Sequence, residues 1–161
     1  MPKYLSLVFI LLFASACNNN NNVSPSSSEK VVDFRSTTKI ADSIQMELDR
    51  VSEENENVQD VKLQFRLKNI SEKAIVYRFP SGCQYGFTVI KNQDTLFDSR
   101  EKVGCTAAIT LLKIKPGQTK VFRIPFELLD NNKKLKKGVY KLNAFLLEGH
   151  TPAISTSFKV E

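Results

Sequence analysis

Residues 61–68 alternate strictly between apolar and polar side chains, and this pattern constrains the fold more than any other part of the chain. A two-residue period is typical of a β-strand with one buried face and one face in water. Two further short apolar runs follow at residues 74–79 and 85–90, with turn-forming residues between the three. We therefore expect residues 61–90 to form three consecutive antiparallel strands, a meander that the rest of the domain covers.

Short apolar or alternating segments recur from this stretch towards both ends of the domain. Pro116 and Gly117 occupy the two central positions of a type II turn. Pro125 indicates that its strand lies at a sheet edge or ends there. Seven to nine short strands with turn signals between them predict an all-β fold, an immunoglobulin-like antiparallel β-sandwich. Besides the three strands above, we expect strands at residues 39–49, 95–97, 109–114, 121–126, 139–147 and 154–160, and at most one helical turn at residues 126–135.

Tyr140 stands just inside a late strand, after the turn at Gly138. This arrangement is typical of the tyrosine corner of immunoglobulin-like sandwiches, and an ordinary core aromatic explains it equally well. Leu142 occupies the position at which antibody domains carry a cysteine, so the usual disulfide between the sheets is not expected.

The first 16 residues are typical of a secretory leader. Lys3 precedes an apolar run at Tyr4–Phe13 that is short for a membrane span, and small residues lead to Cys17. The pattern is typical of a bacterial lipoprotein signal peptide, which predicts cleavage before Cys17 and a lipid, including palmitate, on that cysteine. Two or more acyl chains would anchor the protein stably. The alternative is an ordinary secretory leader in which Cys17 plays no part.

Residues 17–28 are rich in Asn and Ser and have almost nothing apolar to bury, so we expect the lipidated cysteine and a flexible tether there. One folded domain is then expected at residues 29–161. These features predict a location in the cell envelope, anchored to a bacterial membrane, the outer membrane if the cell has one, with the domain outside the cytoplasm. The net charge of +6 at pH 7 is spread along the strands rather than gathered in a stripe, so a nucleic-acid partner is not expected.

Three motifs resemble the BsuPI, or intracellular proteinase inhibitor, family. They are Ser81-Gly82 followed by the strand at residues 85–89, the turn-containing segment at residues 112–118, and the strand at residues 138–144. Gly86 stands where the family usually has an acidic residue. The resemblance implies an immunoglobulin-like sandwich that inhibits a serine protease of the subtilisin type. The alternative is an envelope scaffold or assembly lipoprotein that binds partners through its sheet edges and inhibits nothing.

Signals for an enzyme are weak. His150 is the only histidine, and its place between Gly149 and Pro152 predicts a solvated turn residue rather than a general base. The chain has no phosphate-binding glycine loop and no clustered metal ligands. We therefore expect no catalysis, no metal, no cofactor and no small-molecule substrate, and a membrane and a protease or envelope protein as partners.

Cys83 and Cys105 are predicted to form a disulfide. Export places them in a compartment where disulfides persist, and lipid on Cys17 leaves these two thiols, an even number. Buried free thiols are the alternative. The bond would hold a loop that we name as the candidate contact with a partner. That loop consists of Asp98, Ser99, Arg100, Glu101, Lys102, Val103 and Gly104. A simple staple on a long connection would explain the same bond.

Overall fold

The computed structural model describes residues 31–51, 62–125 and 135–161, which form eleven β-strands and two short helical turns. The leader, Cys17, the tether and most of the possible helical turn at residues 126–135 lie outside the described residues. No helix in the described part is long and apolar enough to cross a membrane. All strand pairs are antiparallel, and the all-β prediction is confirmed.

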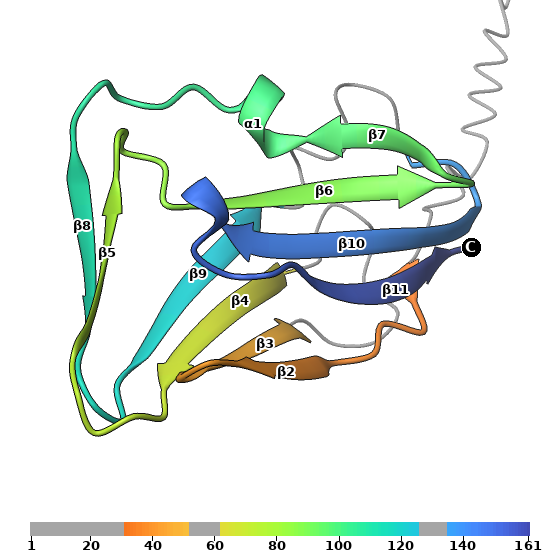
Figure 1. Ribbon diagram of the computed structural model, residues 1–161. Helices are drawn as coiled ribbons and strands as arrows, with labels where there is room; N and C mark the ends of the chain where they lie inside the picture. The colour runs from red at the N-terminus through yellow and green to blue at the C-terminus, as the bar shows by residue number, and fades with distance from the viewer. Residues whose placement is uncertain (1–30, 52–61, 126–134) are drawn as a thin grey trace, which may run out of the picture.

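Two sheets form the layers of a sandwich, and a third, two-stranded sheet stands across one end of them (Figure 1). The first sheet runs in the order β1 (Val31–Val32), β11 (Ile154–Val160), β10 (Gly138–Leu146), β6 (Tyr85–Lys91), β7 (Asp94–Asp98). The second runs β2 (Thr37–Ala41), β3 (Ile44–Arg50), β4 (Lys62–Asn69), β9 (Thr119–Pro125). The third, which we call the end ribbon, pairs β5 (Ile75–Phe79) with β8 (Thr110–Ile114). The helical turns are α1 (Ser99–Lys102) and η3 (Leu147–Gly149).

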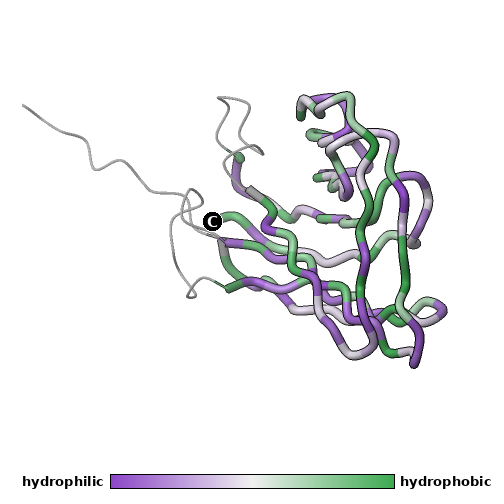
Figure 2. The backbone as a smooth tube through the Cα atoms, turned by 90° about the vertical axis from the view of Figure 1, so that its left-hand side faces the viewer, coloured by the Kyte–Doolittle hydropathy of each residue, from purple (hydrophilic) through white to green (hydrophobic). Residues whose placement is uncertain are grey.

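The core lies between the two larger sheets, where the inward residues of each strand meet. Hydrophobic and hydrophilic residues alternate along the strands (Figure 2), as a sheet with one buried face requires. Aromatic rings connect the layers: Tyr85 of β6 lies 4.7 Å, centroid to centroid, from Phe122 of β9, which stacks on Phe65 of β4. The core residues with no exposed surface are Met46, Leu48, Phe65, Leu67, Phe79, Val89, Ile114, Leu142 and Ala144.

The predicted meander is wrong, although its three strands form. β4 lies in the second sheet, β5 in the end ribbon and β6 in the first sheet. Alternation specifies that a strand has a buried face, and it leaves open which strand lies beside it. Here β4 lies in one layer of the sandwich and β6 in the other, and their apolar faces point into the core between the layers. The chain therefore crosses from one sheet to the other instead of forming a meander within one sheet.

Asn69, at the end of β4, directs the first of these crossings. Its buried side chain donates hydrogen bonds to the carbonyls of Lys73 (2.7 Å) and Ile114 (2.9 Å) and accepts one from the backbone N–H of Ser71. Lys73 lies just before β5 and Ile114 is the last residue of β8, so these bonds join the second sheet to the end ribbon.

The expected strand at residues 39–49 is instead the hairpin β2–β3. Asp42 has a φ of 50° in the two-residue turn, and Ser43 follows it. The apolar residues Ile40 and Ile44 on the two sides of the turn are four positions apart, and this even spacing continues the period of a single strand, which hid the turn in the sequence pattern. Ile40 is consequently exposed, while Ile44 is buried.

The remaining turn and edge predictions agree with the structure. Gly117 has a φ of 70°, and the N–H of Gln118 donates to the carbonyl of Lys115, as the predicted turn requires. Strand β9, which contains Pro125, is an edge strand. The tyrosine corner is also present, because the hydroxyl of buried Tyr140 donates to the carbonyl of Lys136, four residues upstream.

Candidate functional site

The structure joins Cys83 and Cys105 in a disulfide, with their Cα atoms 5.4 Å apart. Cys83 lies in the link between β5 and β6, and Cys105 lies between α1 and β8. The bond therefore connects the two chain segments that run between the first sheet and the end ribbon.

An exposed segment, Cys105–Ile109, begins at this bond; we call it the pinned segment. The carbonyl of Thr106 accepts hydrogen bonds from the N–H of Gly82 and from the N–H of Ala108, both 2.9 Å long. The second of these bonds spans two residues and closes a γ-turn around Ala107. The disulfide and these hydrogen bonds hold the backbone of the pinned segment in place. Each of its residues is exposed, so its side chains face solvent.

The far end of the pinned segment is held by Thr110, the first residue of β8. Its hydroxyl donates to the carbonyl of Ser81 (2.8 Å) and accepts from the side-chain amide of Gln84 (3.3 Å). Gly82 lies close to the exposed Thr106 side chain, because a Cβ at position 82 would lie 2.2 Å from the Thr106 Oγ1 atom and would require that side chain to rotate. The residues around Ser81-Gly82, identified in the sequence only as a family motif, thus form the support of the pinned segment.

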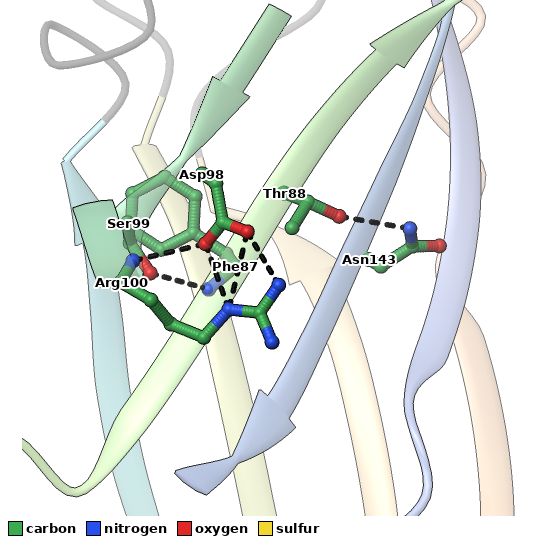
Figure 3. A network of polar contacts seen from close by, with 6 residues as sticks. All are labelled: Phe87, Thr88, Asp98, Ser99, Arg100 and Asn143. Atoms are coloured by element: carbon green, nitrogen blue, oxygen red, sulfur yellow. Dashed lines mark hydrogen bonds and ion pairs between the residues drawn. The ribbon is translucent and has the colours of Figure 1, made fainter. Parts of the chain in front are cut away.

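The predicted contact loop, residues 98–104, contains the short helix α1. Asp98 caps the turn, since its carboxylate accepts from the N–H of Arg100 (2.9 Å). The Ser99 hydroxyl accepts from the N–H of Phe87 (2.9 Å), which fastens α1 to β6 (Figure 3). Asp98 and Ser99 are buried, so within the predicted loop the exposed residues are Arg100, Glu101, Lys102 and Gly104.

The Arg100 guanidinium binds both carboxylate oxygens of Asp98, as Figure 3 shows. This contact lowers the pKa of Asp98 below its ordinary value, mainly through the side-chain hydrogen bond from Arg100. Arg100 also lies over the ring of Phe145, with its Cζ atom 5.4 Å from the centroid.

Phe145 explains why position 86 is glycine in this chain. Gly86 lies opposite Phe145 in the β6–β10 pair. A Cβ at position 86 would lie 2.8 Å from Phe145 Cε2 and 3.1 Å from Leu147 Cδ2. The ring thus fills the space in which a side chain at position 86 would begin.

His150 lies in a turn, as its neighbours in the sequence predicted, but it is half-buried and packed rather than fully solvated. Its ring lies 5.0 Å from that of Tyr77 and 5.1 Å from that of Phe79, centroid to centroid, and its Nε2 atom lies 2.9 Å from the carbonyl oxygen of Arg78. Because a carbonyl only accepts, Nε2 carries a proton. His150 therefore connects the chain after β10 to the end ribbon, and no nucleophile is among its contacts.

Within the described ranges, no three His, Cys, Asp or Glu residues lie close enough together to hold a metal ion. Of the predicted site residues, the structure brings together Cys83 and Cys105, and places Asp98 beside Arg100. The sequence analysis missed the pinned segment, for which the one available signal was the run of small residues Thr106-Ala107-Ala108 after a cysteine.

Comparison with known proteins identifies a family that the chain matches. Residues 46–150 match the family model described as BsuPI, intracellular proteinase inhibitor. The chain belongs to the BsuPI family. No curated protein matches it. The BsuPI match covers β3 to η3 and includes the disulfide, α1 and the pinned segment, while β1, β2 and β11 lie outside it.

Proposed function

We propose that this BsuPI protein inhibits a serine protease of the subtilisin type and that its pinned segment enters the protease cleft. Membership of a proteinase inhibitor family supports the inhibitory class. The observation that carries the choice of contact is the fixed backbone of Cys105–Ile109, held by the disulfide at one end and by Thr110 at the other.

A fixed, exposed segment suits this role for two reasons. Its bound shape is already present, so binding costs less conformational entropy than binding by a free loop. In addition, the side chains of Ala107 and Ala108 are small, which lets a partner approach the backbone closely. In this proposal α1 supports the segment, and the exposed part of the loop Asp98–Gly104 lies at its border.

The test measures hydrolysis of a peptide substrate by a subtilisin-type protease in the presence of the purified chain. We expect the wild type to slow hydrolysis and Ala107→Glu to inhibit at least roughly tenfold more weakly, since it places a charge at the centre of the contact. Ala153→Glu, at an exposed position before β11, is the matched control and should inhibit like the wild type. Equal inhibition by Ala107→Glu would place the contact elsewhere, and no inhibition by the wild type would reject the inhibitor proposal.

We further propose that Cys17 carries lipid and holds the domain at the outer side of a bacterial membrane. The leader, the small residues before Cys17 and the polar tether support this. Radiolabelled palmitate should enter the wild type and not Cys17→Ser. Equal labelling of both would exclude the anchor.

The end ribbon favours a second candidate function, that of an envelope scaffold without inhibitory activity. Its outer face carries Val76 and Leu111, which are 54% and 63% exposed, beside the basic residues Arg78 and Lys113. Exposed apolar side chains gathered on a sheet with open edges are typical of protein interaction surfaces. Leu111→Lys should abolish copurification with envelope partners if this function holds, and should leave protease inhibition unchanged if the first holds.

A further inference from the structure

A partly enclosed cavity of about 210 Å³ lies behind the disulfide, between α1 and the start of β6. Its surface is mainly apolar, and the disulfide itself forms part of the wall. The other apolar side chains that line it are Tyr85, Phe87, Val103, Phe122 and Leu147. The pinned segment follows this wall along the chain, and only its first residue, Cys105, reaches the cavity.

The size and the walls of the cavity fit a single aromatic ring. An apolar protein cavity of about 150 Å³ is large enough to bind benzene. Here Tyr85, Phe87 and Phe122 contribute aromatic rings, with Tyr85 stacked between the other two at centroid distances of 6.5 and 4.7 Å. Aromatic walls favour a ring through offset or edge-to-face contacts, and the volume leaves room for a short substituent.

The strand register directs the nearest charges away from this cavity. Asp98 is paired with Thr88, the neighbour of Phe87 on β6, so its side chain lies on the opposite face of the sheet from the Phe87 ring. Arg100 borders the cavity, but its guanidinium binds both oxygens of Asp98 and lies over the ring of Phe145, and its side chain is 58% exposed. The ion pair is satisfied on that face, so a charged ligand would enter the apolar cavity without a partner.

Ser99 supplies the polar contact inside the cavity. It lines the wall, is only 7% exposed, and accepts through Oγ from the backbone N–H of Phe87. No acceptor in the described part of the chain receives a hydrogen bond from its hydroxyl. Because an unsatisfied buried donor is costly, the Ser99 hydroxyl favours a ligand that brings an acceptor, and the apolar walls favour an uncharged one.

We propose that this cavity binds a small neutral aromatic molecule that carries a hydrogen-bond acceptor such as a carbonyl oxygen. The ring packs against Tyr85 and Phe122, and the acceptor receives a hydrogen bond from the Ser99 hydroxyl. The site is separate from the contact proposed for the protease, so either proposal can hold without the other.

The experiment adds the whole chain to 4-fluoroacetophenone and follows the fluorine signal by NMR. We expect saturable binding by the wild type, and backbone amide shifts at Tyr85, Ser99 and Val103 in the protein spectrum. Val103→Trp fills the cavity and should weaken binding at least roughly tenfold, since a ligand and the new side chain cannot share the space. Val139→Trp, at a position 62% exposed on β10, is the matched control and should bind like the wild type.

Two further probes of nearly the same shape test the acceptor and the charge of the ligand. In 1-fluoro-4-isopropenylbenzene a methylene group replaces the carbonyl oxygen. This alkene should bind the wild type at least roughly threefold more weakly than the ketone, because it cannot accept the hydrogen bond from Ser99. The anion 4-fluorobenzoate should bind at least roughly tenfold more weakly than the ketone, because its charge finds no partner in the cavity.

Each comparison has an outcome that contradicts one part of the proposal. Absence of saturable binding of the ketone, amide shifts confined to other parts of the protein, or equal binding by Val103→Trp would overturn the site. Equal affinity for the ketone and the alkene would overturn the hydrogen bond from Ser99. Equal or tighter binding of 4-fluorobenzoate would overturn the assignment of a neutral ligand.

Discussion

At the scale of single residues, the link between β5 and β6 depends on the missing side chain of Gly82. The N–H of Gly82 donates to the Thr106 carbonyl, and a Cβ at position 82 would displace the Thr106 hydroxyl from its place. The sequence showed Gly82 beside Ser81 as a motif, and the structure shows that its contact is with Thr106 and that its φ is not positive.

Gly82→Ala should destabilise the fold by about 0.5–1.5 kcal/mol, the usual cost of forcing a side chain, here that of Thr106, away from its preferred rotamer. The free energy of unfolding from urea titration measures this change. Gly104→Ala is the matched control, because a Cβ there meets nothing within 4 Å. It should change the free energy by less than about 0.5 kcal/mol. Similar values for both variants would contradict the close approach.

Asp98 gives the protein a pH dependence whose sign follows from its contacts. Because the hydrogen bond from Arg100 lowers its pKa in the folded state, Asp98 stabilises the fold above its ordinary pKa of 3.8. The contribution is lost as pH falls through the lower pKa of the folded state. Asp98→Asn should therefore be less stable than the wild type by about 1 kcal/mol at pH 7, and the difference should shrink below pH 3.8.

Unfolding of both proteins by urea, measured between pH 7 and pH 2, checks this dependence. Asp94→Asn, at an exposed position at the start of β7, serves as the control and should follow the wild type throughout. A difference for Asp98→Asn that stays constant down to the lowest pH would show that the charge of Asp98 is not the cause.

At the scale of elements, the end ribbon is attached to the sandwich by a few specific contacts. Asn69 binds it from the second sheet, His150 packs on its inner face, and Thr110 binds the link before β6. A two-stranded sheet is marginal alone, so these attachments determine whether β5 and β8 stay ordered.

His150→Ala should loosen the end ribbon without abolishing inhibition. It removes two ring contacts and one hydrogen bond, which together contribute about 1–2 kcal/mol. Hydrogen exchange should speed up at the amides of β5 and β8 and stay unchanged in β10. Loss of inhibition by a variant that keeps its fold would give His150 a functional role that its contacts do not indicate.

The disulfide joins the same elements and encloses a loop with a sequence separation of 22 residues. On the chain-entropy model such a bond contributes roughly 3 kcal/mol, so the double variant Cys83→Ser, Cys105→Ser should lose about that much stability. Thermal unfolding measures the loss. Free thiols at both positions in protein taken from cells, found by mass spectrometry of a non-reduced digest, would contradict the bond.

At the scale of the whole molecule, the sequence predicted most strands and few of their neighbours. Alternation located β4, β6 and β11 closely, because each has one buried face and the period of two follows directly. Pairing depends on contacts between residues far apart in the chain, and nothing in the local pattern of β4 encodes its place between β3 and β9.

The same limit applies to the candidate site. The two cysteines could be paired from the sequence, because chemistry and compartment restrict their partners. The pinned segment and the cavity could not be found, since both arise where the β5–β6 link meets the chain after α1. That meeting depends on Gly82, Thr106 and Ser81 lying together, which is again a long-range property.

The order of strands in the sheets also decides when the domain can fold during synthesis. Each sheet combines a strand from before residue 99 with one from after residue 109: β6 with β10, β4 with β9, and β5 with β8. A nascent chain that ends before β8 can complete none of the three. Folding therefore waits for nearly the whole polypeptide, and such distant pairings are slow to form. Until then the half-made sheets expose open edges, which makes this the interval in which the protein most needs protection from aggregation and proteolysis.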